Sequence, residues 1–367
     1  MNRYAQYAAF LSFALAMALL AGYYVMFHVF IFLGLPGGIL LWGATALTAL
    51  LFMAGMGLSA VSDNPSLRGV NIALGVWTGF FLILAFILMF MDIAGLFLRW
   101  PDYRMVGTVA LVIAAAAAIA GGVNARFVRM RKVNVPAKGL ARPTRIVQLS
   151  DLHLGPVNGL DYFKKVVERT NRERPDMVLI TGDFIDGRLA DDMFAPINDL
   201  NAPVFFCPGN HEEYVGMEEF LEHLGRTKAR PLLCEKVDFG DIELAGIDFS
   251  WRSADFDAMI SKVVPSGKKY SILMSHGPPA FDAARKAGFD LTLSGHTHGG
   301  QFWPFTGFGR IFVKYRAGLY ERDGKRLFVT TGTGTWGPPL RLGSRSEMAI
   351  IEIGGAVEGE NERHIIK

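Results

Sequence analysis

Histidine and carboxylate residues gather in short loops in the second half of this sequence. The densest example is Gly295-His296-Thr297-His298, which follows an apolar run that contains Leu291 and Leu293. Imidazole binds borderline cations, and flanking glycines let the backbone turn tightly and approach a ligand closely. Taken alone, this segment is equally compatible with a pair of surface histidines, so its interpretation depends on what accompanies it.

Further loops carry the same residue types, and each follows an apolar run with the length of a strand. They are Ser150-Asp151-Leu152-His153, Gly182-Asp183-Phe184-Ile185-Asp186, Gly209-Asn210-His211-Glu212 and Ser275-His276-Gly277. Together with Gly295–His298, these loops hold five of the eight histidines of the chain. Sites in sheets of this type form at the carboxyl ends of the strands, so we expect the loops to converge on one edge.

The donors in these loops suit catalytic metal ions. Carboxylates, imidazoles and one amide, without a thiolate, favour Mn²⁺, Fe²⁺ or Zn²⁺ in an open site over a structural cysteine-zinc site. The supply is too large for one catalytic ion, but it matches two ions about 3.5–4 Å apart that share a carboxylate. Such a pair lowers the pKa of a bridging water and holds the oxygens of an in-line displacement at phosphorus.

The apolar runs also predict the elements that must position the loops. A strand, a helix over Leu160–Glu173 and a second strand form the first unit, because apolar residues recur at helical spacing between two short apolar runs. Arg310–Leu319 and Tyr320–Thr331 are predicted to be antiparallel strands, and Asp323-Gly324 in this region is a hairpin-turn signal. The other predicted strands are Ile146–Leu149, Met177–Ile180, Val204–Cys207, Ile242–Ile247, Tyr270–Met274, Leu291–Leu293 and Met348–Ile353.

In order, spacing and residue type, the five blocks resemble the signature of the calcineurin-like metallophosphoesterase superfamily, over about residues 145–353. The resemblance implies an α/β fold, namely a sandwich of two mixed sheets flanked by helices. It also implies hydrolysis of a phosphodiester or pyrophosphate bond by attack of a metal-bound hydroxide. The implied ligands are Asp151, His153 and His298 for the first ion, Asn210, His276 and His296 for the second, and Asp183 as the bridge.

The resemblance also implies two catalytic residues. His211 would face the phosphoryl oxygen and the leaving group, as an electrostatic stabiliser or general acid. Glu212 would orient the imidazole of His211 or stabilise its charge. The remaining candidates are interpreted as structural, with Asp186 capping or hydrogen-bonding its own loop; they are Asp186, Asp248, His223 and His364.

Residues 1–125 have the composition of a membrane region. They hold only seven charged side chains, and apolar runs occupy about 8–33, 39–61, 70–91 and 106–125. Each run is long enough to cross a hydrocarbon core roughly 30 Å thick as a helix, whereas a soluble bundle would need polar faces. We therefore predict a four-helix transmembrane region, in which His28 and Asp92 receive no chemical role.

The rest of the chain has an ordinary charge balance. Removing the four Arg and three Asp of residues 1–125 from the totals of 37 and 34 leaves 33 basic and 31 acidic residues. That balance gives no support for nucleic-acid binding.

Cys207 and Cys234 form no CxxC pair, and Cys207 is expected to be a buried, inert thiol. We expect a basic juxtamembrane linker at 126–143, a catalytic domain at 144–355 and a loose tail at 356–367.

Basic residues follow the last apolar run directly and predict the orientation. They are Arg126, Arg129, Arg131, Lys132, Lys138, Arg142 and Arg145. The opposite side of the membrane would hold only Arg99 and Arg104. The positive-inside rule therefore predicts the catalytic domain on the cytoplasmic side of the inner (plasma) membrane. The linker charges suit anionic head groups, although a solvated linker explains them equally well.

The substrate is predicted less directly. Ser275–Pro279, Gly299–Gln301 and Thr330–Arg345 resemble a membrane-associated bacterial branch, similar to UDP-2,3-diacylglucosamine pyrophosphatases of lipid A synthesis. A lipid-linked or envelope-precursor phosphate, without an obligate protein partner, is therefore the leading hypothesis. The alternatives are soluble nucleotides or phosphoproteins, and a non-catalytic phosphate-binding scaffold. Four aromatic residues are compatible either with lining an apolar approach for acyl chains or with ordinary core packing. They are Trp251, Phe302, Trp303 and Phe305.

Overall fold

The computed structural model describes residues 3–61, 65–100, 102–137, 139–354 and 365–366. It divides into two compact units. The first unit comprises Met1–Val123 with Gly337–Leu340, and the second comprises Asn124–Trp336 with Arg341–Lys367. All the predicted site residues belong to the second unit.

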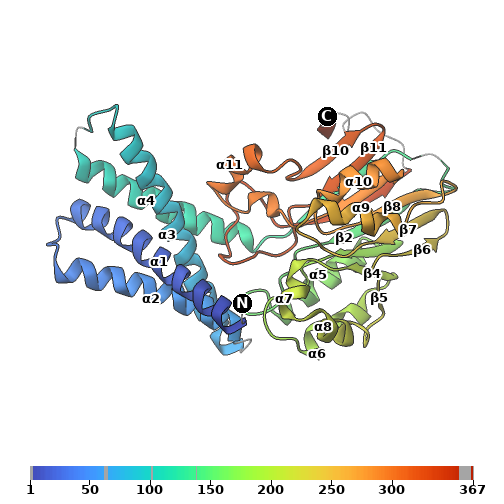
Figure 1. Ribbon diagram of the computed structural model, residues 1–367, viewed down its shortest axis with the longest axis horizontal. Coiled ribbons are helices and arrows are strands. Elements are labelled where there is room, and N and C mark those ends of the chain that lie inside the picture. Colours follow the sequence, from blue (N-terminus) through green and yellow to red (C-terminus); the bar gives the residue numbers. More distant parts are fainter. Residues whose placement is uncertain (1–2, 62–64, 101, 138, 355–364, 367) are drawn as a thin grey trace. The chain divides into compact units, whose positions relative to one another are not determined.

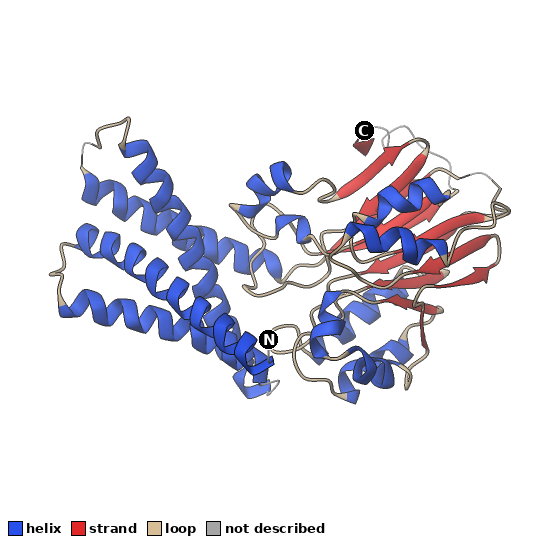
Figure 2. Ribbon diagram, in the orientation of Figure 1, coloured by secondary structure: helices blue, strands red, loops and turns tan. Residues whose placement is uncertain are grey.

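The first unit is helical (Figures 1 and 2). Its elements are α1 (Arg3–Leu33), α2 (Ile39–Val61), η1 (Pro65–Leu67), α3 (Arg68–Gly95) and α4 (Tyr103–Ala125). Within the described residues, α1 to α4 are the four helices long and apolar enough to cross a membrane, as predicted. Their outer surfaces carry apolar side chains such as Leu20 and Ile119, which are each more than 60% exposed. Such a surface is expected to face lipid.

Polar groups inside this helical unit bond to one another. The Asp92 carboxylate accepts a hydrogen bond from the Tyr24 hydroxyl at 2.7 Å and lies 3.1 Å from Nε2 of His28. The Tyr103 hydroxyl donates to the same carboxylate. Because polar groups in an apolar environment need such partners, these contacts support the structural interpretation of His28 and Asp92.

The second unit is built on two mixed sheets, shown as arrows in Figure 2. Within the described residues, the first sheet has the strand order β1-β12-β2-β3-β4-β5, and the second has the order β13-β10-β11-β9-β8-β7-β6. Strands β2, β3 and β4 run parallel, with Val147 beside Val178 and Val178 beside Val204. Strands β7, β8 and β9 are also parallel neighbours. The strands are β1 (Arg129–Val135), β2 (Thr144–Leu149), β3 (Met177–Thr181), β4 (Val204–Cys207), β5 (Ala229–Pro231), β6 (Glu235–Phe239), β7 (Ile242–Gly246), β8 (Tyr270–Met274), β9 (Leu291–Ser294), β10 (Gly318–Arg322), β11 (Lys325–Val329), β12 (Glu347–Ile353) and β13 (Ile365–Ile366).

A buried apolar layer joins the facing sides of the two sheets. Ile146 and Leu179 of the first sheet pack with Ile272 and Leu293 of the second. Helices cover the outer sides, so the predicted sandwich of two mixed sheets flanked by helices is confirmed. The helices are α5 (Leu160–Arg172), α6 (Asp191–Phe194), η2 (Ala195–Asp199), α7 (Asn210–Val215), α8 (Met217–Leu224), α9 (Ser253–Ser261), α10 (Ala280–Ala287), η3 (His298–Gly300) and α11 (Phe305–Phe312).

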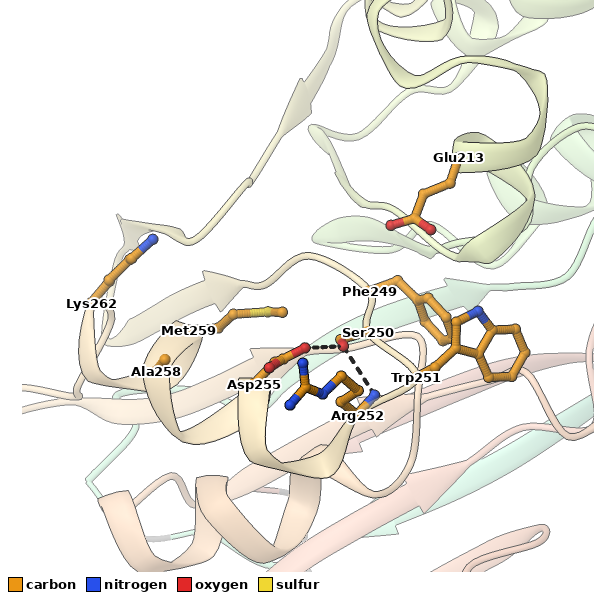
Figure 3. Close-up of a pocket in the computed structure, with 9 residues that line it drawn as sticks. All are labelled: Glu213, Phe249, Ser250, Trp251, Arg252, Asp255, Ala258, Met259 and Lys262. Carbon is orange, nitrogen blue, oxygen red and sulfur yellow. Dashed lines mark hydrogen bonds between the residues drawn. The ribbon is translucent and has the colours of Figure 1, made fainter. Parts of the chain in front are cut away.

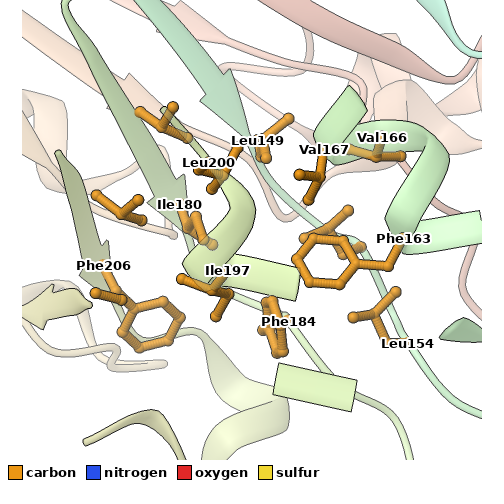
Figure 4. Close-up of a cluster of buried hydrophobic side chains, with 14 of the residues drawn as sticks. Leu149, Leu154, Phe163, Val166, Val167, Ile180, Phe184, Ile197, Leu200 and Phe206 are labelled. Carbon is orange, nitrogen blue, oxygen red and sulfur yellow. The ribbon is translucent and has the colours of Figure 1, made fainter. Parts of the chain in front are cut away.

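The outer core of the first sheet holds the site loops firmly in place. Helix α5 buries Phe163, Val166 and Val167 on one face, as their helical spacing predicts. The ring of Phe163 packs edge-on against the ring of Phe184, the residue that follows Asp183 (Figure 4). A fully buried aromatic residue next to a predicted ligand fixes the backbone at that ligand.

The segment before the last hairpin differs from the prediction. Arg310–Leu319 was expected to be a strand, but helix α11 covers Phe305–Phe312 and β10 begins only at Gly318. The sequence permits the helix, because Phe305, Phe308 and Phe312 recur at helical spacing after Pro304. The hairpin turn itself lies where it was predicted, with Asp323 and Gly324 both at positive φ between β10 and β11.

Segments predicted to be irregular contribute strands. The linker contains β1, whose Val133 and Val135 are buried and which pairs in parallel with β12. Basic residues at its exposed positions interrupt the apolar pattern, so the sequence did not predict this strand. Ile365–Ile366, within the predicted tail, form β13 beside β10, so that prediction was wrong there; residues 356–364 of the tail lie outside the described residues.

Candidate active site

The predicted site loops all begin where strands end. Strands β2, β3 and β4 are neighbours in the first sheet, and β8 and β9 are neighbours in the second. Their carboxyl ends lead directly into the five histidine- and carboxylate-bearing loops. Side chains from these loops form groups whose ligand atoms lie within 4.8 Å of one another. The predicted convergence on one edge therefore occurs.

One group consists of Asp151, His153 and His298. Nε2 of His298 lies 3.4 Å from a carboxylate oxygen of Asp151 and 3.0 Å from Nε2 of His153. All three side chains are buried. Two ring nitrogens facing each other at this distance, beside a carboxylate, present lone pairs that a cation can share.

A second group consists of Asp183, His276 and His296. Oδ2 of Asp183 lies 3.1 Å from Nε2 of His276 and 3.8 Å from Nε2 of His153, so this carboxylate faces both groups. Nδ1 of His296 lies 3.2 Å from Nε2 of His276. A carboxylate between two sets of imidazoles has the position that a bridging ligand needs.

Asn210 supplies a further donor at the start of α7. Its side chain is buried, and its Oδ1 atom has no hydrogen-bond partner among the described residues. An unpaired buried acceptor costs free energy that a bound cation would recover. The amide oxygen of Asn210 therefore fits the predicted role of metal ligand.

Strained backbone conformations concentrate at these residues. Non-glycine residues rarely adopt positive φ, and such strain clusters at functional sites. The predicted ligands at positive φ, between 45° and 70°, are Asp151, His153, Asp183, His296 and His298.

Two glycines permit the close packing of the loops. A Cβ atom at Gly209 would lie 2.2 Å from Oδ1 of Asp183, and one at Gly295 would lie 2.3 Å from Oδ2 of Asp151. Both carboxylates would have to move to admit a larger residue. The glycines of these two motifs are therefore required by sterics, in addition to any role in turning the chain.

The buried carboxylates of the cluster favour positive charge beside them. Burial alone would lower the pKa values of His153 and His276, but nearby carboxylates, mainly Asp186 and Asp183, raise them to about 9 and about 10. Burial and the neighbouring imidazoles lower the pKa values of His296 and His298. The buried carboxylates thus hold positive charge close to them, which divalent ions would supply at higher density.

These observations test whether the side chains fit the predicted metal pair. Two groups of nitrogen and oxygen donors, a carboxylate that faces both and an orphaned amide oxygen form a set suited to divalent ions. Six of the predicted ligands lie in these two groups: Asp151, His153, Asp183, His276, His296 and His298. Asn210 precedes His211, whose backbone N–H donates to Oδ1 of Asp183. The donor set fits a binuclear centre.

The expected role of Glu212 requires correction. Its buried carboxylate does not serve the imidazole of His211; it accepts hydrogen bonds from the backbone N–H groups of Asp183, Phe184 and Gly209 at 2.6–3.0 Å. These bonds fasten the Asp183 loop to the Gly209 loop. Sequence adjacency to His211 suggested a direct contact, but the first turn of α7 directs neighbouring side chains differently.

Asp186 occupies the position that had been expected of Glu212. Its Oδ1 atom lies 2.6 Å from Nδ1 of His211 and 2.8 Å from Nδ1 of His153. Burial alone would raise the pKa of Asp186, but the two imidazoles hold it at about 2. The interpretation of Asp186 as a loop residue was therefore too narrow. The sequence signal that could have indicated this contact is the position of Asp186 at the end of the Gly182–Asp186 block.

Arg341 was not predicted at all. Its fully buried guanidinium donates to the backbone oxygen of His298 at 2.8 Å and to that of Gly334 at 2.5 Å. Burial lowers the pKa of Arg341 to about 10, so it remains charged at neutral pH. A single arginine in a stretch rich in Pro and Gly gave little sign of this position, because its contact with His298 spans 43 residues of sequence.

Trp251 lines two cavities near the cluster. One, of about 540 Å³, carries polar side chains including Glu213, Arg252 and Lys262 (Figure 3). The other, of about 580 Å³, reaches from His296 to Phe312 and Val313 of α11. Trp251 lines both cavities, and its ring lies 5.4 Å from the ring of His296, a predicted metal ligand that lines the second cavity.

Fold and site together define a metal-dependent phosphoesterase of the two-sheet type. The model of the calcineurin-like phosphoesterase family matches residues 144–300. An uncharacterised metallophosphoesterase of Campylobacter jejuni is 33% identical over 69% of this chain and 71% of that protein. One from Aquifex aeolicus is 36% identical over 62% of this chain and 93% of its own length. The chain therefore belongs to the calcineurin-like metallophosphoesterase family.

A vertebrate relative joins the same two parts. A transmembrane protein with metallophosphoesterase domain from Danio rerio is 30% identical over 66% of this chain and 61% of its own length. The match thus spans about three fifths of that relative. Within its described residues, this chain likewise has four helices long and apolar enough to cross a membrane, followed by a phosphoesterase domain.

Proposed function

We propose that this protein is a membrane-anchored phosphohydrolase that cleaves a phosphodiester or pyrophosphate bond in a lipid-linked substrate. Family membership supports the phosphoesterase chemistry. The observation that carries the substrate class is the cavity between His296 and Phe312, in a chain with apolar membrane helices. A metal site next to an apolar wall suits a phosphate that carries a hydrocarbon chain.

The metal pair would be held by the converging side chains. Asp151, His153 and His298 would bind one ion, and Asn210, His276 and His296 would bind the other, with Asp183 between them. When bound, divalent ions such as Mn²⁺, Fe²⁺ or Zn²⁺ stabilise charge on phosphoryl oxygens and acidify water.

His211 would act on the leaving group. Nδ1 of its imidazole faces Asp186, and Nε2 lies 3.9 Å from Asp183 on the side of the metal cluster. With Nδ1–H held by Asp186, a proton on Nε2 would face a phosphate bound at the metal cluster. The imidazole can then donate this proton to the leaving oxygen, or stabilise its developing charge.

Trp251 would divide the substrate into two ends. The cavity with Arg252 and Lys262 suits a polar head group, and the cavity toward Phe312 suits an apolar chain. Basic residues after the last membrane helix favour a catalytic unit on the cytoplasmic side of the plasma membrane. A tag at Lys367 that reacts with an impermeant reagent in intact cells would contradict this orientation.

Hydrolysis by the purified full-length chain in lipid nanodiscs with added Mn²⁺ tests the proposal. We expect turnover of bis(p-nitrophenyl) phosphate, reduced at least about 100-fold by Asp183→Asn. Asp238→Asn, which alters a surface ion pair with Lys269, is the matched control. A phospholipid ester in mixed micelles should be cleaved with higher kcat/KM than soluble nucleotides. Preference for nucleotides would refute the lipid proposal, and no turnover of any ester would refute catalysis.

A further inference from the structure

The last turn of helix α11 exposes large apolar side chains. Ile311 and Phe312 are 74% and 82% exposed, whereas Phe305 at the start of the helix packs against Phe302. A helix at the surface of a soluble domain normally buries such residues. We call Ile311 and Phe312 the α11 stripe.

Polar contacts hold the opposite side of α11. The buried Thr306 hydroxyl donates to the backbone oxygen of Leu342, and the Arg316 guanidinium donates to the backbone oxygens of Thr306 and Gly299. The outward direction of the stripe is therefore fixed by contacts on the inner side. This arrangement suits a helix whose apolar face meets something other than water.

The α11 stripe is also continuous with the metal site. Gly299, which Arg316 contacts, follows the predicted ligand His298 directly. The cavity of about 580 Å³ is lined by Phe312 at one end and by His296 and Trp251 at the other. An apolar group that enters beside Phe312 would therefore arrive at a metal ligand.

The chain itself brings a bilayer within reach of this domain. Helix α4 ends at Ala125 and β1 begins at Arg129, so the intervening backbone spans at most about 14 Å. Phe127 is 64% exposed, and the basic residues Arg126, Arg129 and Lys132 are exposed around it. Aromatic and basic side chains of this kind settle at the head-group level of anionic membranes.

From these observations we propose that the α11 stripe inserts into the head-group region of the bilayer that α1 to α4 cross. There it acts as an interfacial amphipathic helix. The cavity beside Phe312 then opens toward lipid, and a phosphorylated amphiphile reaches the metal site without passing through water. The last step rests on the proposed function, whereas insertion of the stripe does not.

Spin-label accessibility in the full-length chain tests the insertion. A nitroxide is attached at Ile311→Cys in a Cys234→Ser background, since Cys207 is buried. The protein is reconstituted in vesicles of phosphatidylethanolamine and phosphatidylglycerol. We expect the ratio of collisions with oxygen to collisions with a water-soluble nickel chelate to be at least about threefold that of a label at Lys268→Cys. Lys268 lies on an exposed polar turn and is the matched control.

Two outcomes of that measurement would overturn the proposal. Equal ratios at the two positions would mean that the stripe faces water. Protection of the Ile311 label from both oxygen and nickel would mean that protein covers the stripe, either a second copy or another part of the chain.

Kinetics separate this inference from the proposed function. Ile311→Glu should lower hydrolysis of a vesicle-embedded phospholipid ester about tenfold and leave turnover of bis(p-nitrophenyl) phosphate unchanged. Ile311→Leu should retain both rates. A lipid-accessible label in a protein that hydrolyses no ester would refute the enzyme proposal alone. Equal hydrolysis of the embedded ester by wild type and Ile311→Glu would refute a role for the stripe in substrate delivery.

Discussion

Oδ1 of Asp186 lies 2.6 Å from Nδ1 of His211, and the same oxygen contacts Nδ1 of His153 at 2.8 Å. One carboxylate therefore orients the imidazole proposed to serve the leaving group and an imidazole proposed to bind metal. In both rings, the contact directs Nε2 toward the centre of the site. Asp186 therefore links the two imidazoles through a single oxygen atom.

Asp186→Asn should lower kcat about 10- to 100-fold and weaken metal retention less severely, because the ligand atoms themselves remain. An amide can present its N–H₂ group to an imidazole nitrogen and so favour the wrong tautomer. Steady-state rates with bis(p-nitrophenyl) phosphate, together with metal content after dialysis, check this expectation.

The chain offers a matched control for that variant. Asp191 forms a comparable contact with Nδ1 of His223 at 2.5 Å, but on the surface beside Arg226. Asp191→Asn should leave kcat within about twofold of wild type. Equal losses in the two variants would show that Asp186 acts through stability alone.

Gly209→Ala should disrupt the centre although it adds only a methyl group. The new Cβ would lie 2.2 Å from Oδ1 of Asp183, an oxygen that already accepts a hydrogen bond from the backbone N–H of His211 at 3.0 Å. We expect loss of at least one bound ion per chain, measured by elemental analysis of the purified protein. Gly307→Ala, where a Cβ meets open space, should bind metal normally. Full metal occupancy in Gly209→Ala would contradict this packing argument.

Arg341→Lys should weaken metal binding about tenfold, because an ammonium group cannot reproduce the fork that spans the backbone oxygens of His298 and Gly334. Competition with a fluorescent chelator provides the measurement. Arg145→Lys is the control, since Arg145 forms a fork with Glu352 on a strand distant in sequence from the site loops. If Arg341→Lys bound metal as tightly as Arg145→Lys, the guanidinium would have no positioning role.

Glu243 should make stability depend on pH. Burial alone would raise its pKa, but hydrogen bonds from Ser266 and Lys236 outweigh burial and hold the pKa below the ordinary value of 4.5. The contact therefore stabilises the fold above that value, and this contribution is lost as the pH falls through the lowered pKa.

The variant Glu243→Gln should be less stable than wild type by about 1–3 kcal/mol at pH 7. The difference should shrink as the pH falls from about 4.5 to 3, because wild type then loses its charge as well. Urea unfolding followed by tryptophan fluorescence at several pH values gives the comparison. A difference that stays constant across this range would exclude the charge of Glu243 as its cause.

The sequence by itself determined the chemistry and the architecture. Residue types and spacing identified the blocks from Asp151 to His298, because a metal ligand must be a particular side chain at a particular loop position. Length and lack of charge likewise predicted the apolar helices before residue 126. Both kinds of signal are local, so a single sequence carries them.

Only the tertiary structure decided the contacts between distant segments. Asp186 rather than Glu212 faces His211, because loop strain and the first turn of α7 set side-chain directions that adjacency does not reveal. Arg341 reaches His298, and β1 joins β12, through packing of residues far apart in the chain. The outward face of α11 is likewise fixed by its inner polar contacts, since amphipathic spacing gives a stripe but not the side on which it lies.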